Sequence, residues 1–168
     1  MFQKNSLMPG IRLTNLILAL GSAGLIGVGL YFQYQLGLTP CALCITQRIF
    51  IIAVGVTAAV AALLGVRYGW RRVLAGLGML LAIIGGGFSS RQLWLQSLPE
   101  DLVPACGPSL GYILDAFPLK DALAVLLRGD GNCAEVVWTF LGVSIPGWTL
   151  VAFIGLALIN LWQILRKA

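Results

Sequence analysis

The sequence contains no histidine and few charged residues. Of its 168 residues 10% are charged, against about 25% in typical globular chains. The absence of histidine excludes a histidine acid or base from any site. The scarcity of charge, with 59% hydrophobic residues and a mean hydropathy of +0.93, excludes an ordinary soluble domain. Internal repeats and low-complexity tracts are also missing from the sequence.

The chain has instead four long apolar stretches, at about residues 13–31, 45–66, 73–90 and 147–165. Each is close to the ~17–25 residues that a helix needs to cross a ~30 Å hydrocarbon core. We therefore predict an all-α membrane protein, with a four-helix transmembrane bundle in a single membrane domain over residues 1–168. The first stretch is long for a cleaved signal, and three spans follow it, so we expect it to be retained.

The charges are divided between the two sides of this predicted bundle. Every acidic residue lies between the third and fourth spans. Positively charged loops favour the cytoplasmic side, so we predict that both termini are cytoplasmic. The net charge of +5 orients the protein and requires no nucleic-acid partner. Seven basic residues mark the cytoplasmic side: Lys4, Arg12, Arg67, Arg71, Arg72, Arg166 and Lys167.

The two predicted external loops differ in length. The first covers about residues 32–44 and the second about residues 91–146. Within the second loop, residues 110–129 are rich in leucine and are interrupted by Pro118. We interpret them as short helices on the membrane surface. A small external cap packed on the bundle is the alternative.

Small residues recur at helical spacing within the spans. Ala23 and Gly27 lie in the first span, and Gly78, Ala82 and Gly86 lie in the third. Such spacing lets helix backbones approach closely in lipid. We expect these residues at helix–helix contacts.

All four cysteines lie on the predicted external side. Cys41 and Cys44 stand at the outer end of the second span, and Cys106 and Cys133 lie in the long loop. Disulfides persist on an oxidising face of a membrane. A zinc site, two structural disulfides and redox chemistry are the three interpretations. Zinc is disfavoured because the second pair is widely separated, whereas such sites use closely spaced pairs.

The stretch "TPCALC" favours redox chemistry. Thr39 can cap a helix and Pro40 can be its first residue, which would place Cys41 in the first turn and Cys44 one turn later. The N–H groups and dipole at a helix start stabilise a thiolate. A disulfide across so short a loop adds little chain-entropy stabilisation. A structural role therefore explains this pair poorly.

Arg48 lies just inside the second apolar stretch. It follows Cys44 by four residues and Cys41 by seven, so all three share one helix face. A charged residue at the bilayer centre costs about 2.5–3.5 kcal/mol on insertion scales, and less near the interface. Arg48 is either a snorkelling side chain that reaches the headgroups or a donor to an oxygen-bearing, membrane-soluble redox partner beside Cys44.

Three stretches carry a resemblance to a known family: "YFQYQLGLTPCALCITQR", "RQLWLQSLP" and "GNCAEVVWTFLGVSIPGW". With the four-span layout, the chain resembles the disulfide bond formation protein B (DsbB) family of bacterial inner-membrane thiol oxidases over nearly its whole length. The resemblance implies a thiol:quinone oxidoreductase in the bacterial inner membrane. It also implies that the four cysteines are periplasmic.

The resemblance further implies a route for electrons. A reduced periplasmic dithiol protein of the DsbA type would attack a Cys106–Cys133 disulfide at Cys106. Cys133 would then exchange with Cys41. Cys44, left as a thiolate, would pass electrons to a quinone from the membrane pool, ubiquinone or menaquinone, held near Arg48.

Gln96 also matches a family position near the quinone. The sequence departs from well-known members at Gln47, where they have glutamate, and in its lack of histidine. No carboxylate role and no histidine acid or base can therefore be carried over. The alternative function is a non-catalytic membrane protein whose four cysteines form structural bridges or a metal site; we expect no metal.

Overall fold

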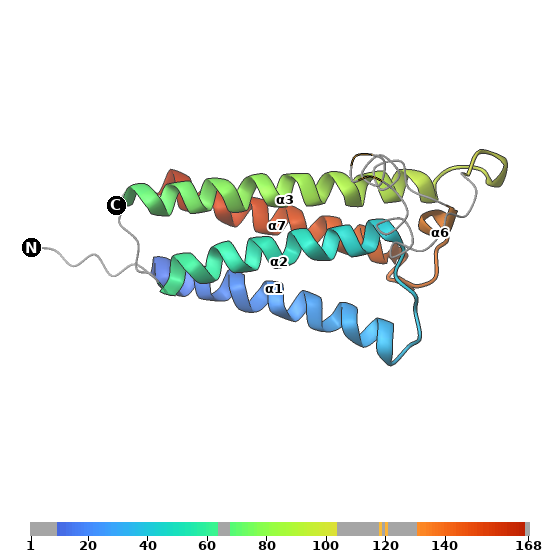
Figure 1. The fold of residues 1–168 in the computed structure, drawn as a ribbon, viewed down its shortest axis with the longest axis horizontal. Coiled ribbons are helices and arrows are strands. Elements are labelled where there is room, and N and C mark those ends of the chain that lie inside the picture. Colours follow the sequence, from blue (N-terminus) through green and yellow to red (C-terminus); the bar gives the residue numbers. More distant parts are fainter. Residues whose placement is uncertain (1–9, 64–67, 104–117, 119, 121–130, 167–168) are drawn as a thin grey trace, which may run out of the picture.

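Four long helices form the computed structural model of the chain. They are α1 (Ile11–Tyr34), α2 (Ala42–Leu63), α3 (Tyr68–Gln96) and α7 (Ile145–Leu165), and they lie side by side (Figure 1). Each is long and apolar enough to cross a membrane. The predicted class, an all-α membrane protein with a four-helix bundle, is confirmed, and the chain is a multi-pass membrane protein. The structure describes residues 10–63, 68–103, 118, 120 and 131–166.

Large apolar side chains cover the outside of the bundle. Leu20, Val73 and Leu158 are each about 60% exposed, and they stand on three different helices. A continuous apolar surface of this kind marks contact with a membrane or a partner. On four helices of spanning length it is the surface expected to face lipid.

The helices pack in sequence, α1 against α2, α2 against α3, and α3 against α7. The main core is centred on Val54 and Phe153, which are almost fully buried. Gly85 of α3 lies against the Phe153 ring and leaves no room for a Cβ atom. The predicted small residues Gly78 and Gly86 lie against Asn160 and Phe153 of α7, and Ala82 is buried, so a close α3–α7 contact through small residues is confirmed.

The expected small-residue contact on α1 is wrong. Ala23 and Gly27 are exposed, and an added Cβ at Gly27 would meet nothing within 4 Å. The close approach uses another face of α1, where Ser22 packs against Gly55; a Cβ on that glycine would stand 2.8 Å from the Ser22 Cβ. Spacing alone did not identify the packed face, because several faces of α1 carry small residues.

Two helix bounds differ from the predicted ones in ways that matter for the site. α3 continues to Gln96, past the predicted end at residue 90, so the long loop does not begin at residue 91. Glutamine and arginine are good helix formers, and Gln92 is buried within the bundle. α2 begins at Ala42, because the Cys41 carbonyl accepts the backbone hydrogen bond of Ile45 at 3.1 Å.

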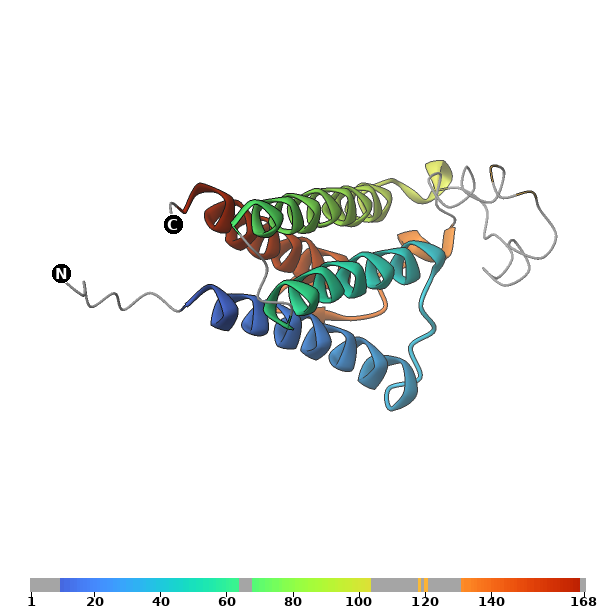
Figure 2. The ribbon, with the colours of Figure 1, turned by 60° about the vertical axis from the view of Figure 1, so that its left-hand side comes forward.

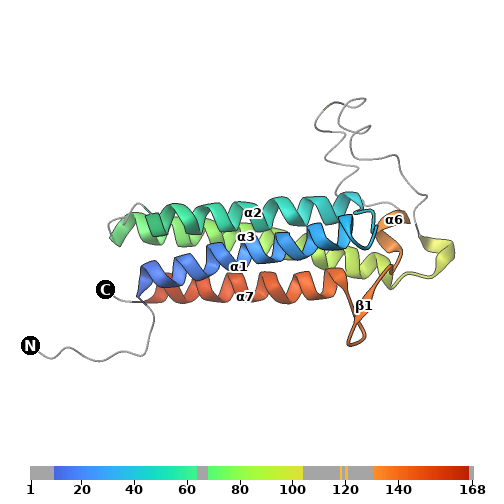
Figure 3. The same cartoon turned by 90° about the horizontal axis from the view of Figure 1, so that it is seen from below.

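The segment between α3 and α7 contains a 3₁₀ helix, η1 (Glu100–Leu102), and the short helix α6 (Gly131–Ala134). It also contains an antiparallel hairpin that was not predicted, β1 (Thr139–Phe140) and β2 (Val143–Ser144), seen beside the start of α7 in Figure 3. Leu141 and Gly142 have φ of 53° and 79°, the signs that a type I′ turn requires. The predicted surface helices of residues 110–129 lie outside the described residues, apart from residues 118 and 120.

The two ends of the bundle carry different features. The start of α1 and the end of α7 lie at one end, and α6 lies at the other (Figures 1 and 2). The start of α2, with its cysteines, lies at the α6 end. Toward this end α1 leans away from α2 (Figure 1).

Candidate redox site

Cys41 and Cys44 form a thiol pair at the start of α2. The Cys41 thiol donates a hydrogen bond to the Cys44 sulfur over 3.2 Å. Cys41 stands at the cap position, immediately before the helix, and not in the first turn as predicted. Cys44 lies in the first turn, where backbone N–H groups have no carbonyl partner within the helix. The helix start thus presents both sulfurs together.

Cys133 brings a third sulfur to the same place. It stands on α6, is fully buried, and packs against Leu43 and Leu95. Hydrogen bonding with the Cys133 side chain, and then with Cys44, raises the pKa of the Cys41 thiol, and burial adds to this. Cys41 therefore holds its proton between two other sulfurs. Cys106, the fourth cysteine of the predicted site, lies outside the described residues.

Gln92 contacts these sulfurs and Gln47 contacts Gln92, and the sequence predicted a role for neither glutamine. Gln92 of α3 places its Nε2 atom 3.3 Å from Cys44 Sγ and 3.5 Å from Cys41 Sγ. Gln47 of α2 donates from Nε2 to Gln92 Oε1 over 2.8 Å. Gln92 belongs to the quoted stretch "RQLWLQSLP", but it falls in a segment predicted as loop. The length of α3 is what brings it to the cysteines.

Arg48 lies one turn below the cysteines and is held by α1. Its Nη1 donates to Gln33 Oε1 over 2.6 Å, and its Nη2 donates to the Gly29 carbonyl over 2.9 Å. The guanidinium therefore bridges α2 and α1 near the end of α1. These contacts favour a fixed position over a snorkelling side chain.

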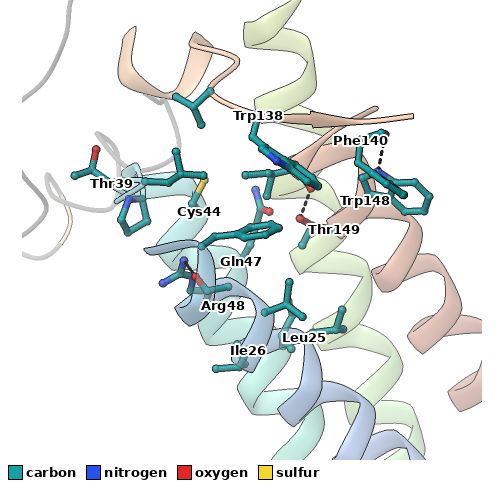
Figure 4. A pocket seen from close by; sticks show the side chains of 18 residues that line it. Leu25, Ile26, Thr39, Cys44, Gln47, Arg48, Trp138, Phe140, Trp148 and Thr149 are labelled. Atoms are coloured by element: carbon teal, nitrogen blue, oxygen red, sulfur yellow. Dashed lines mark hydrogen bonds between the residues drawn. The ribbon is translucent and has the colours of Figure 1, made fainter. Parts of the chain in front are cut away.

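A cavity of about 300 Å³ opens beside Cys44 and Arg48 (Figure 4). Its walls come from α1, α2, the residues before α2, the hairpin segment and the start of α7. Aromatic rings close one side: Trp138 lies 4.8 Å from Phe32 and 6.1 Å from Phe140 between ring centroids. The Trp148 indole donates to the Phe140 carbonyl over 3.1 Å. The cavity is thus mostly apolar, and its wall includes the Cys44 sulfur, the Arg48 guanidinium and the Gln47 amide.

Gln96 does not line this cavity. Its Oε1 accepts a hydrogen bond from Ser144 Oγ over 2.8 Å, and its Nε2 lies 3.5 Å from the Glu135 carbonyl. The side chain therefore ties the end of α3 to the segment that leads into α7. Its predicted place beside a quinone remains a prediction that these contacts do not support.

Known proteins resemble the chain over nearly its whole length. Residues 11–163 match the family model described as disulfide bond formation protein DsbB. A disulfide bond formation protein B from Saccharophagus degradans is 58% identical over 161 residues, covering 96% of this chain and 97% of the relative. Proteins of the same name from Stutzerimonas stutzeri and Chromobacterium violaceum are 47% and 46% identical, covering 88% and 94% of this chain and 91% and 98% of the relatives.

The predicted resemblance is therefore confirmed. The cluster of sulfurs at one end of four helices of spanning length is suited to the redox chemistry of disulfide formation. The chain belongs to the DsbB family of disulfide bond formation proteins, multi-pass membrane oxidoreductases.

Proposed function

We propose that this protein reoxidises a periplasmic dithiol protein of the DsbA type and passes the electrons to a membrane quinone. The observation that carries the proposal is the position of Cys44. Its sulfur touches Cys41 on one side and forms part of the cavity wall on the other. A sulfur placed in this way can exchange with a thiol and also reach an apolar acceptor.

The first half of the reaction is thiol–disulfide exchange. The partner thiolate attacks Cys106 of a Cys106–Cys133 disulfide, forming a mixed disulfide and releasing Cys133 as a thiolate. Cys133 then attacks the Cys41 sulfur of a Cys41–Cys44 disulfide, and the electron pair of the broken bond moves to Cys44. The contact between the Cys133 and Cys41 side chains supports this second step.

The second half is reduction of the quinone. A quinone ring and the first part of its apolar tail suit a cavity of about 300 Å³ with aromatic walls. The residues present fit such a group, because Cys44 offers a reducing sulfur and Arg48 offers N–H donors for an oxygen. The second thiol of the partner then attacks the mixed disulfide, which forms the partner disulfide and releases Cys106; Cys106 attacks Cys133, and this frees Cys41 to re-form its bond with Cys44. In net terms, two electrons and two protons pass from the partner dithiol to the quinone, giving a partner disulfide and a quinol.

The test uses the purified protein in detergent, a reduced DsbA-type protein, and ubiquinone or menaquinone. We expect quinone absorbance to fall in step with the loss of partner thiols, and comparison of the two quinones identifies the acceptor. Cys44→Ser should abolish quinone reduction. Absence of reduction with both quinones, or full activity in Cys44→Ser, would contradict the proposal.

A further inference from the structure

Gln92 and Gln47 form a buried amide pair between α3 and α2 to which the reaction above assigns no role. Each side chain is only 3% exposed. Burying an amide without hydrogen bonds costs about 1–3 kcal/mol by protein mutational data. The pair avoids this cost by contacts with each other and with the sulfurs of Cys41 and Cys44.

The contacts fix which way the Gln92 amide points. An amide has an oxygen that accepts and an NH₂ group that donates. The Gln47 NH₂ occupies the Gln92 oxygen at 2.8 Å, so the Gln92 NH₂ is turned toward the two sulfurs. When Cys44 carries a proton, its thiol can donate a hydrogen bond to the same oxygen, which lies 3.6 Å from the sulfur. The amide therefore suits both the thiol and the thiolate form of Cys44.

We propose that Gln92 is a catalytic residue that stabilises negative charge on the Cys44 sulfur, and that Gln47 is the positioning residue that keeps its NH₂ group there. This inference rests on the proposed function, in which Cys44 is the leaving sulfur. As Cys133 bonds to Cys41, the Cys41–Cys44 bond breaks and the charge moves from Cys133 to Cys44. A stabilised leaving thiolate departs faster.

Of the described groups near Cys44, Gln92 is the one that can donate a hydrogen bond to it throughout this step. Cys41 donates to Cys44 in the structure, but in this step its sulfur is bonded first to Cys44 and then to Cys133, so it carries no proton to donate. Arg48 of α2 shares the cavity, but the hydrogen bonds described for it run from Nη1 and Nη2 to Gln33 and Gly29 of α1, and its remaining N–H hydrogens are those proposed to bind the quinone oxygen. The Gln92 amide keeps its hydrogens throughout.

The experiment isolates Cys44 in the full-length chain, with Cys41→Ala, Cys106→Ser and Cys133→Ser. The rate of Cys44 alkylation by iodoacetamide is measured against pH by mass spectrometry, without quinone or partner. With Cys41 and Cys133 replaced, no neighbouring thiol of the described site titrates, and Arg48 is the same in all variants. Gln92→Leu should move the midpoint of the profile upward by about one to two pH units.

Gln47→Leu is the second variant. It removes the donor that holds the Gln92 oxygen and adds no charge beside Cys44, so the Gln92 NH₂ is no longer kept toward the sulfurs. The midpoint should again rise, by less than in Gln92→Leu. The matched control is Gln163→Leu, which removes a buried amide near the end of α7, away from the cysteines. The midpoint of this variant should equal that of the parent.

An unchanged midpoint in Gln92→Leu, in protein that unfolds at the parent temperature, overturns the proposal, and an unchanged midpoint in Gln47→Leu removes the positioning role of Gln47. If Gln92→Leu does not fold, Gln92→Met takes its place, because it keeps the length of the side chain and has no N–H donor. The assay needs no turnover, so its result is separate from that of the proposed function. Failure of quinone reduction in the unmodified protein would remove the proposed function and leave the effect of Gln92 on Cys44 measurable.

Discussion

Arg48 shows how one residue joins packing and chemistry. Its two hydrogen bonds to α1 hold the guanidinium at the cavity wall, and a charged hydrogen bond to a quinone oxygen is worth about 1.5–3 kcal/mol. Arg48→Ala should therefore raise the KM for quinone about 10- to 150-fold. Lysine should restore only part of the affinity, because it keeps the charge but loses the planar fork.

Quinone titrations of the two Arg48 variants test this, with Gln33→Leu as the matched control. Gln33→Leu removes one acceptor and leaves the guanidinium in place, so its KM should rise less than that of Arg48→Ala. An unchanged KM in a folded Arg48→Ala protein would leave Arg48 with a structural role only.

The sequence identified some of the individual site residues and missed others. Cys41, Cys44 and Arg48 could be singled out because their spacing places them on one helix face. Gln92 could not, since a glutamine after an apolar stretch resembles a solvated helix end. Its role depends on a contact with α2 across 45 positions of sequence, and no local pattern records such a contact.

At the scale of elements, the contact of α3 with α7 depends on Gly85. A methyl group there would meet the Phe153 ring, and overpacking of a core typically costs about 1–3 kcal/mol. Gly85→Ala should therefore lower the unfolding temperature in detergent. Gly87→Ala is the control on the same helix, because a Cβ there meets nothing within 4 Å, and it should unfold at or slightly above the parent temperature. Equal temperatures for the two variants would refute the close contact.

α6 and the loop around it should serve the protein partner, whereas the start of α2 should serve the quinone. Cys106→Ser or Cys133→Ser should block oxidation of the DsbA-type protein. Oxidation of a small dithiol through Cys41, Cys44 and quinone should partly survive. Activity assays with both substrates measure the difference, and identical defects in loop and helix variants would argue against two separate pairs.

The elements themselves were predictable to different degrees. The four spans follow from apolar length, which the bilayer thickness dictates. The hairpin was missed because its strands have two residues each, too few to show alternation, and Leu141–Gly142 lacks the Asn or Asp of common hairpin turns. The meeting of Cys133 with Cys41 was implied by resemblance to a family, since cysteine spacing alone does not determine pairing.

At the scale of the whole molecule, the orientation in the membrane is a prediction from charge. The described cysteines lie at the end of the bundle opposite the start of α1 and the end of α7 (Figure 1). If the positively charged end is cytoplasmic, a membrane-impermeant thiol reagent should label the cysteines of intact cells, with the outer membrane permeabilised, after mild reduction. A cysteine introduced near the end of α7, as in Leu165→Cys, is the control and should stay unlabelled. Labelling of the native cysteines only after the inner membrane is broken would reverse the orientation.

The cysteines whose sulfurs cluster in the structure are added to the growing chain at different times. Cys41 and Cys133 are about 90 residues apart in the chain, and a ribosome adding ~5–20 residues per second needs roughly 5–20 s to travel between them. Disulfide formation takes seconds to hours, so its fastest events fall within the time of synthesis. During that interval Cys41 and Cys44 have each other and no Cys133, so an oxidation this early cannot form the bridge to Cys133, and the local bridge has the first opportunity to form.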